Sequence, residues 1–440
     1  MNNPKINLKL IIPIGLMLFS FFFGAGNLIF PPVLGQLSGE YAALAALGFC
    51  ISGVGLPLTG IVAMAMNRSD NPDHMAEPVH PRYARILVVL CALTIGPFFA
   101  IPRTAAVSFD TGILAFVPAG YHDIGLAVYS AIFFLITYYL SVNPSKIVDS
   151  IGKFMAPALL LCLFSLIFFA VTDPMGSAQQ PMNEYAAAPF FKGFLEGYNT
   201  MDLLATLLFG AATVNAITNM GITDQKQLTR LCIYSGFIAA GCLAFIYCSL
   251  AYIGVTSVEM FGIVASGGQL LNMIAVHYMG SFGKVMLALI IFFACITTSI
   301  GLTSSISSYF NLIFKNKAQY QRYVLAICLF SFAVSNIGLN NIIRLSIPVL
   351  CMLYPITIVL VLLNVASPLF HRDSKIFRPC IALTTIFAVF DGLRAAGIDT
   401  GFIHSFLAAY MPLYNIGFGW ILPCLTGILV GAVQKAFAKN

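Results

Sequence analysis

Long apolar segments alternate with short polar connections from one end of the 440-residue chain to the other. Each segment is close to the roughly 20 residues that a helix needs to cross the hydrocarbon core of a bilayer. The lengths of these segments and the positions of their helix breakers predict twelve membrane-spanning helices, at 10–34, 40–66, 84–109, 124–141, 147–171, 197–218, 229–254, 282–311, 321–336, 345–364, 377–396 and 412–434. The segment GGQLLNMIAVHYMG between the seventh and eighth is helical in pattern but too short to span, so we expect an external loop helix there.

The composition agrees with a membrane protein. Hydrophobic residues make up 59% of the chain and charged residues 9%, compared with about 25% charged residues in a typical soluble domain. No room remains for a sizeable soluble domain, so we predict one membrane domain over residues 1–440. The first apolar run continues from Lys9 past Phe30, which is too long for a signal peptide and favours a first span. The eleven cysteines form no CxxC pair, which argues against a disulfide framework or a zinc site.

The basic residues indicate the orientation of the chain. Seventeen of the 22 Lys and Arg residues fall at the two chain ends and in the connections after every second predicted span, against four in the other connections. Since cytoplasmic loops carry the excess of Lys and Arg, both termini are expected to be cytoplasmic. This topology also explains the net charge of +6, so nothing points to a nucleic-acid partner.

Two spans carry glycines where a helix would otherwise be continuous. The first contains SFFFGAGNLIFPP, and the sixth contains ATLLFGAATVNAITN, so that Phe23-Gly24-Ala25 is repeated as Phe209-Gly210-Ala211. Because the copies lie five spans apart, in the first and the sixth span, they must run in opposite directions through the membrane. Interrupted helices at matching places of inverted repeats indicate a transporter's binding site. The alternative is that these glycines only allow close helix packing.

The residues near these breaks suggest a chemistry. Free N–H groups at a half-helix amino end suit a carboxylate, and carbonyls freed by unwinding suit an ammonium group or a cation. The eighth span holds a run of hydroxyls that includes Thr297 and Thr298; these either bond to their own helix or coordinate a hard cation such as sodium. Asp202 is the carboxylate nearest the sixth-span motif and is either functional or a helix cap. Asp391 and Arg394, three residues apart, are expected to pair.

At FGAGNLIFPP, and again at GYNTMDLLATLLFG, the sequence resembles the bacterial branched-chain amino acid:cation symporter family over essentially its whole length. The resemblance implies import of leucine, isoleucine and valine with sodium across the bacterial cytoplasmic membrane. The first span is also similar to that of sodium-coupled amino acid transporters with the LeuT-like fold, whose pattern is Gly-x-Gly-Asn followed by Phe-Pro. This implies an all-α fold with a five-plus-five inverted repeat, at about 10–171 and 197–364, and two additional helices at about 377–434.

The LeuT-like pattern also implies roles for individual residues. The backbone amides of Ala25 and Gly26 would bind the substrate carboxylate. The implied substrate site as a whole consists of Gly24, Ala25, Gly26, Asn27, Asp202, Thr206, Phe209, Gly210 and Ala211. The implied sodium ligands are the carbonyls of Ser20 and Phe23 together with Ala294, Thr297 and Thr298.

Other functions remain open on the sequence alone. A proton-coupled or exchanging amino acid carrier of the same fold is the main alternative, with Asp202 as its nearest titratable group. A membrane enzyme or a channel is a third class, but the sequence has no HExxH, GxSxG or P-loop motif, and a channel has no need of two opposed breaks. We therefore expect a transporter, not an enzyme, with no cofactor other than sodium as the coupling ion.

Overall fold

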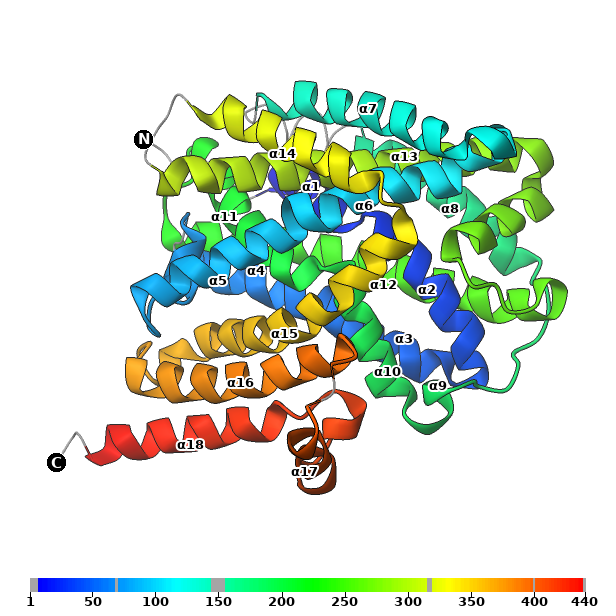
Figure 1. Cartoon of the computed structure of the whole chain (residues 1–440). Coiled ribbons are helices and arrows are strands. Elements are labelled where there is room, and N and C mark those ends of the chain that lie inside the picture. The colour runs from blue at the N-terminus through cyan, green and yellow to red at the C-terminus, as the bar shows by residue number, and fades with distance from the viewer. Residues whose placement is uncertain (1–6, 68–69, 144–154, 315–318, 399, 438–440) are drawn as a thin grey trace.

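A computed structural model of the chain describes residues 7–67, 70–143, 155–314, 319–398 and 400–437. These described residues form helices and connections and contain no strand. Most of the long helices lie side by side in one bundle, with α15, α16 and α18 stacked on one side of it (Figure 1).

Helices occupy every predicted span. In chain order they are α1 (Leu8–Phe22) and α2 (Ala25–Ser38), α3 (Ala42–Cys50) and α4 (Leu56–Met66), α5 (Pro81–Leu93) and α6 (Ala100–Val107), α7 (His122–Ser141), α8 (Ala156–Thr172), α10 (Pro189–Glu196) and α11 (Asp202–Asn219), α12 (Gln225–Phe261), α13 (Gly267–Ile313), α14 (Tyr320–Ser335), α15 (Leu339–Val365), α16 (Ser374–Ala395) and α18 (Ile421–Phe437). Two short helices, α9 (Glu184–Ala187) and α17 (Phe402–Tyr410), lie in connections. The part of the fifth predicted span before residue 155 lies outside the described residues.

By length and composition, fewer than twelve of the described helices qualify as membrane spans. Among the described residues, seven helices are long and apolar enough to cross a membrane, and a further pair, α10 with α11, qualifies as one bent span. Four shorter apolar helices accompany them: α1, α8, α14 and α18. The chain is therefore an all-helical, multi-span membrane protein, and the count of twelve remains a prediction.

Glycine marks one of the bends. The predicted loop helix forms the first part of α13, and Gly280 (φ 55°, ψ −138°) separates it from the eighth span. A positive φ of this kind is readily adopted only by glycine, so the kink is set by the sequence.

The core gathers around the two halves of the first span. α1 and α2 both pack against α12 and α13, while α11 packs against α4 and α13. Large aromatic side chains fill this contact, among them the fully buried Phe19, Phe23 and Phe209. This packing places the end of α1, the start of α2 and the start of α11 in the middle of the bundle.

Candidate substrate and cation site

The first span is broken where the sequence predicts. α1 ends at Phe22 and α2 begins at Ala25, with Phe23 (φ −77°, ψ 89°) and Gly24 (φ −120°, ψ −158°) between them. Because the chain is extended here, the N–H groups in the first turn of α2 have no helical carbonyl behind them. The Gly24 N–H donates to Asn27 Oδ1 at 3.0 Å. The break is thus confirmed, and Asn27 braces it from the first turn of α2.

The second break lies at Met201, not at Phe209–Ala211. The chain bends by 48° between the segments Pro189–Thr200 and Asp202–Asn219, and Met201 adopts a left-handed conformation (φ 66°, ψ 8°). α11 then continues unbroken through the predicted position, so that prediction is wrong. A Cβ on Gly210 would come within 2.7 Å of Met64 Cγ on α4. Close helix packing therefore explains this glycine.

Polar residues surround the second break. The Thr200 hydroxyl donates to the carbonyl of Gly197 at 2.9 Å and accepts from the N–H of Asp202 at 3.4 Å. A left-handed conformation costs a non-glycine residue about 1–2 kcal/mol, and such strain is concentrated at functional sites. The signal that sequence reasoning missed is the tetrapeptide GYNT directly before Met201, because Asn and Thr offer the backbone hydrogen bonds that compete with helix.

Asn27 connects the two breaks. Its Nδ2 donates to Asp202 Oδ2 at 2.7 Å and also to the hydroxyl of Tyr247 on α12. All three side chains are buried, and that of Asp202 is only 4% exposed. A role as a helix cap alone does not account for Asp202, because its carboxylate accepts a hydrogen bond from Asn27 of the first broken span.

Arg103 of α6 bonds to the segment that precedes the second break. Its Nη1 donates to the Asn199 carbonyl at 2.7 Å, and its guanidinium lies 5.7 Å from the centroid of the Phe30 ring on α2. A Cβ on Gly26 would lie 2.9 Å from Arg103 Nη2. The guanidinium therefore connects both broken spans, and a Cβ at position 26 would displace it from its present place.

A small internal cavity lies between the breaks. Its volume is about 20 Å³, which is space for about one water molecule. Residues from both breaks line it, together with side chains of α1, α6, α11 and α13: Phe21, Gly24, Ala25, Gly26, Asn27, Arg103, Thr200, Met201, Asp202, Phe209 and Thr298. The structure thus brings together most of the implied substrate residues.

Three implied substrate residues lie elsewhere. Thr206 Oγ1 donates to the Pro57 carbonyl of α4 at 3.1 Å, and Gly210 faces the same helix. Ala211 lines a second, larger cavity of about 460 Å³. Phe209 of the same helix does line the small cavity, so these three residues fall outside it because they lie on other faces of α11.

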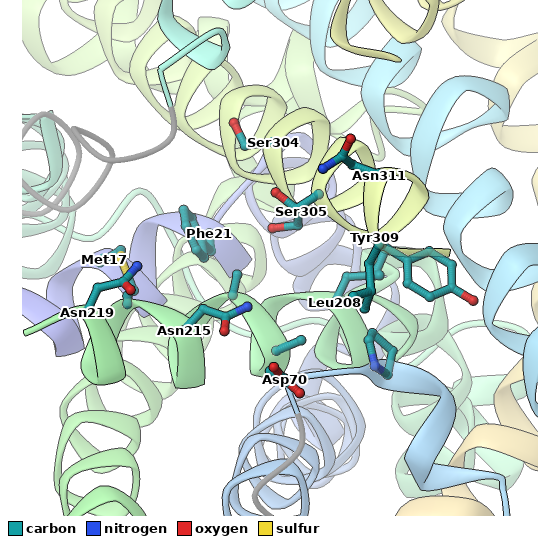
Figure 2. Close-up of a pocket in the computed structure, with 16 residues that line it drawn as sticks. Met17, Phe21, Asp70, Leu208, Asn215, Asn219, Ser304, Ser305, Tyr309 and Asn311 are labelled. Atoms are coloured by element: carbon teal, nitrogen blue, oxygen red, sulfur yellow. The ribbon is translucent and has the colours of Figure 1, made fainter. Parts of the chain in front are cut away.

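The larger cavity runs between α1, α11 and α13. Figure 2 shows polar side chains from these helices around it, including Asn215 and Asn219 of α11 and Ser305 of α13. Phe21 borders both cavities and stacks on Phe209, with the ring centroids 4.8 Å apart. Phe21 therefore lies between the two spaces, with Phe209 packed against it on the side of the small cavity.

The implied sodium ligands gather beside the first break. Thr297 Oγ1 lies 3.2 Å from the Ser20 carbonyl and 3.1 Å from that of Ala294. Thr298 Oγ1 lies 3.2 Å from the Ser20 carbonyl, and a Cβ on Gly24 would come within 2.9 Å of this hydroxyl. Phe23, whose carbonyl belongs to the broken segment, has no contact of this kind with the cluster.

The oxygen types in this cluster suit a hard cation. Hydroxyl and carbonyl oxygens are ligands that ions such as Ca²⁺ and, by analogy, Na⁺ prefer. No group of three or more His, Cys, Asp or Glu that could hold a metal occurs within the described ranges. The candidate cation ligands are thus hydroxyl and carbonyl oxygens of α1 and α13.

Comparison with known proteins places the chain in a family. The family model described as "Branched-chain amino acid transport protein" matches residues 7–438. The branched-chain amino acid permease BraB of Bacillus subtilis is 42% identical, covering 97% of this chain and 95% of its own length. The permease BrnQ of the same organism is 40% identical over 99% of both chains. A branched-chain amino acid transport system 3 carrier protein of Pseudomonas aeruginosa is 38% identical over 94% and 93%.

Solved structures agree on the fold. MhsT in complex with L-phenylalanine matches with a TM-score of 0.61 at 13% identity, covering 98% of both chains. A nucleobase-cation-symport-1 family transporter matches with a TM-score of 0.58 at 14% identity, over 96% of this chain and 91% of its own. This likeness establishes a LeuT-like fold. The sequence relatives of this chain are named as permeases and transport proteins, not as enzymes. The chain belongs to the branched-chain amino acid transport protein family.

Proposed function

We propose that this protein imports leucine, isoleucine and valine into a bacterial cell together with sodium. The family and the printed names of its relatives support the substrate class. The observation that carries the proposal is that the breaks at Phe23–Gly24 and at Met201 face one buried cavity. A site formed by two half-helix ends suits a small zwitterion.

The zwitterion would lie between the two breaks. Its carboxylate would accept from the N–H groups of Ala25 and Gly26, where the amino end of α2 carries partial positive charge. Its ammonium group would donate to carbonyls of the unwound segment before Met201 and to the Asp202 carboxylate. Asp202 already accepts from Asn27, so substrate, both breaks and α12 would share one hydrogen-bond network.

Aromatic rings would surround the aliphatic side chain. Phe21 and Phe209 line the cavity, and both are buried. An apolar pocket separates substrates that differ by one methylene by only about 1–3 kcal/mol. Transport of three aliphatic amino acids by one site is the expected result.

Substrate binding requires the cavity to expand. Its volume of about 20 Å³ is too small for any amino acid. Parting of the Phe21–Phe209 stack would join it to the larger cavity between α1, α11 and α13. With the orientation proposed from the basic residues, that larger cavity would open toward the cytoplasm, which would correspond to an inward-facing state of an alternating-access cycle.

Sodium would bind where the first span meets α13. The proposed ligands are the carbonyls of Ser20, Phe23 and Ala294 and the hydroxyls of Thr297 and Thr298. One Na⁺ moving inward across about 100 mV releases about 2.3 kcal/mol, and a roughly tenfold gradient adds about 1.4 kcal/mol. One ion per cycle is then sufficient for about several-hundred-fold accumulation of substrate.

The proposal includes a topology. Twelve spans, with spans 1–5 and 6–10 as inverted repeats, would place the two breaks at equivalent positions. Both termini would then be cytoplasmic in the bacterial inner membrane. Cysteine-accessibility labelling of single cysteines at the two chain ends, in sealed cells and in inverted vesicles, tests this topology.

Radiolabelled leucine uptake into proteoliposomes tests the function. We expect accumulation with an inward sodium gradient, and competition by unlabelled isoleucine and valine. Uptake driven by external acid and indifferent to sodium would reject sodium coupling and favour a proton-coupled carrier that uses Asp202. Absence of uptake under every gradient would reject the transport proposal.

A further inference from the structure

A third cavity, separate from the two described above, lies between α10, α15 and α16. Its volume is about 440 Å³, and the connection before α18 closes one side of it. α15 and α16 pack along each other, and α10 lies near their ends (Figure 1). In the proposed orientation this cavity opens to the outside of the cell.

An acidic side chain without a partner lines this cavity. Asp391 of α16 is only 7% exposed, and neither of its carboxylate oxygens has a hydrogen-bond partner. Burial without a partner disfavours the charged form of a carboxylate. A positively charged ligand in the cavity would stabilise that form.

The neighbouring arginine does not pair with this acid. Arg394 was expected to bond with Asp391, but its guanidinium donates to the carbonyls of Tyr414 at 2.8 Å and Asn415 at 3.0 Å. It also lies over the Tyr414 ring, 5.5 Å from the centroid. The nearest fixed cation is thus committed to the connection before α18.

A second buried polar atom, the Tyr198 hydroxyl, could also bind a positively charged ligand in this cavity. Tyr198 also lines the cavity, and its hydroxyl has no hydrogen-bond partner. The ionisable side chains lining the cavity are Glu184, Lys192, Glu196, Asp391 and Arg394, three acids and two bases. Lys192 lies 2.8 Å from Glu184 and 3.2 Å from Glu196, so the lining as a whole carries one net negative charge. Asp391 is the acid of this lining whose carboxylate oxygens have no hydrogen-bond partner.

The remaining wall is apolar. It includes Phe191, Leu195, Ile347 and Leu350. An ammonium group has three N–H donors, which can serve both Asp391 oxygens and the Tyr198 hydroxyl. An aliphatic body attached to that group would cover the apolar wall.

From these contacts we infer that the cavity is a second ligand site, which binds the ammonium group of a small aliphatic amine or amino acid. Tyr198 and Asn199 form part of its wall and directly precede the break at Met201. A bound ligand therefore restrains the outer half of the sixth span. Occupancy slows the transport cycle without competing for the substrate cavity.

Calorimetric titration with 3-methylbutylamine tests this site. The amine has the ammonium group and branched body of leucine but lacks the carboxylate that the amides of Ala25 and Gly26 require. We expect it to bind the wild-type protein and to bind Asp391→Asn at least tenfold more weakly. The matched control is Asp110→Asn, which removes an acid from a separate cavity beside α13 and leaves amine binding unchanged.

Leucine uptake separates this proposal from the transport function. The amine should lower the maximal rate of wild-type uptake, while Asp391→Asn should transport leucine normally and lose this inhibition. If Asp391→Asn does not fold, Tyr198→Phe keeps the ring and should weaken amine binding several-fold. The stoichiometry of leucine binding identifies the occupant. Two leucine sites per wild-type chain and one per Asp391→Asn chain would show that leucine itself binds in this cavity. One leucine site in both proteins would leave an amine as the occupant.

Three results would overturn the inference. They are no amine binding to the wild type, equal binding to wild type and Asp391→Asn, and inhibition that raises only KM equally in both proteins. The last would place the amine in the central cavity. Failure of leucine uptake in the wild type, with Asp391-dependent amine binding intact, would reject only the proposed function.

Discussion

Replacement of Thr298 by valine is the sharpest perturbation of the proposed cation site. Valine has the shape of threonine but lacks the hydroxyl, which lies 3.2 Å from the carbonyls of Ser20 and Phe21. A hydrogen bond or contact to a charged group contributes about 1.5–3 kcal/mol. Loss of this ligand should therefore raise the sodium concentration for half-maximal leucine uptake by about 10- to 100-fold, since 1.4 kcal/mol is about tenfold.

The same helix provides the control. Thr303 is fully buried on α13 and its hydroxyl has no hydrogen-bond partner, so Thr303→Val should leave the sodium dependence unchanged. Thr298→Ser keeps the hydroxyl and should remain within a few-fold of the wild type. The assay is initial leucine uptake into proteoliposomes at a series of external sodium concentrations. The reasoning is refuted if Thr298→Val shows the wild-type sodium dependence while remaining fully active.

Two further substitutions test the contact between the broken spans. Gly26→Ala would place its Cβ 2.9 Å from Arg103 Nη2 and 3.2 Å from the Asn199 carbonyl, and we expect leucine uptake to fall at least tenfold. The control Gly241→Ala, with no atom within 4 Å of its Cβ, should transport normally. Equal uptake by the two variants would contradict the role of position 26. Asp202→Ala leaves the buried Asn27 amide without its 2.7 Å acceptor; equilibrium binding should show at least tenfold weaker leucine affinity, and an unchanged affinity would remove Asp202 from the site.

The sequence predicts much of this fold because the physical signals are strong. Apolar length identifies membrane helices with little ambiguity, and helices occur at every predicted position. Gly24 and the following Gly26-Asn27 pair were also sufficient to place the first break. There, two glycines are required by close contacts to Thr298 and Arg103, so the motif reflects a geometric need.

The second break could not be placed by the same reasoning. Gly210 looks like a helix breaker but serves to let Met64 approach, whereas the residue that adopts the left-handed conformation is Met201, a residue type that rarely does so. Met201 is held there partly by local bonds of the Thr200 hydroxyl to Gly197 and Asp202 and partly by a tertiary bond from Arg103 to the Asn199 carbonyl. A contact between residues almost a hundred positions apart is not visible in a local motif.

The pairing of Asp391 with Arg394 failed for a similar reason. Residues three apart on a helix can meet, but the carbonyls of Tyr414 and Asn415 offer Arg394 better-placed acceptors. These belong to a connection whose position depends on the packing of α18 against α16. Helical spacing indicates which residues can pair, while the packed structure decides which do.

A cryo-electron microscopy structure of the protein with leucine and sodium tests the central claim most directly. The account predicts leucine density between Gly24–Asn27 and Thr200–Asp202, with its carboxylate at the amides of Ala25 and Gly26 and the Phe21–Phe209 rings moved apart. Leucine bound only elsewhere, or a first span wound continuously through Phe23–Gly24 when leucine is bound, would contradict it.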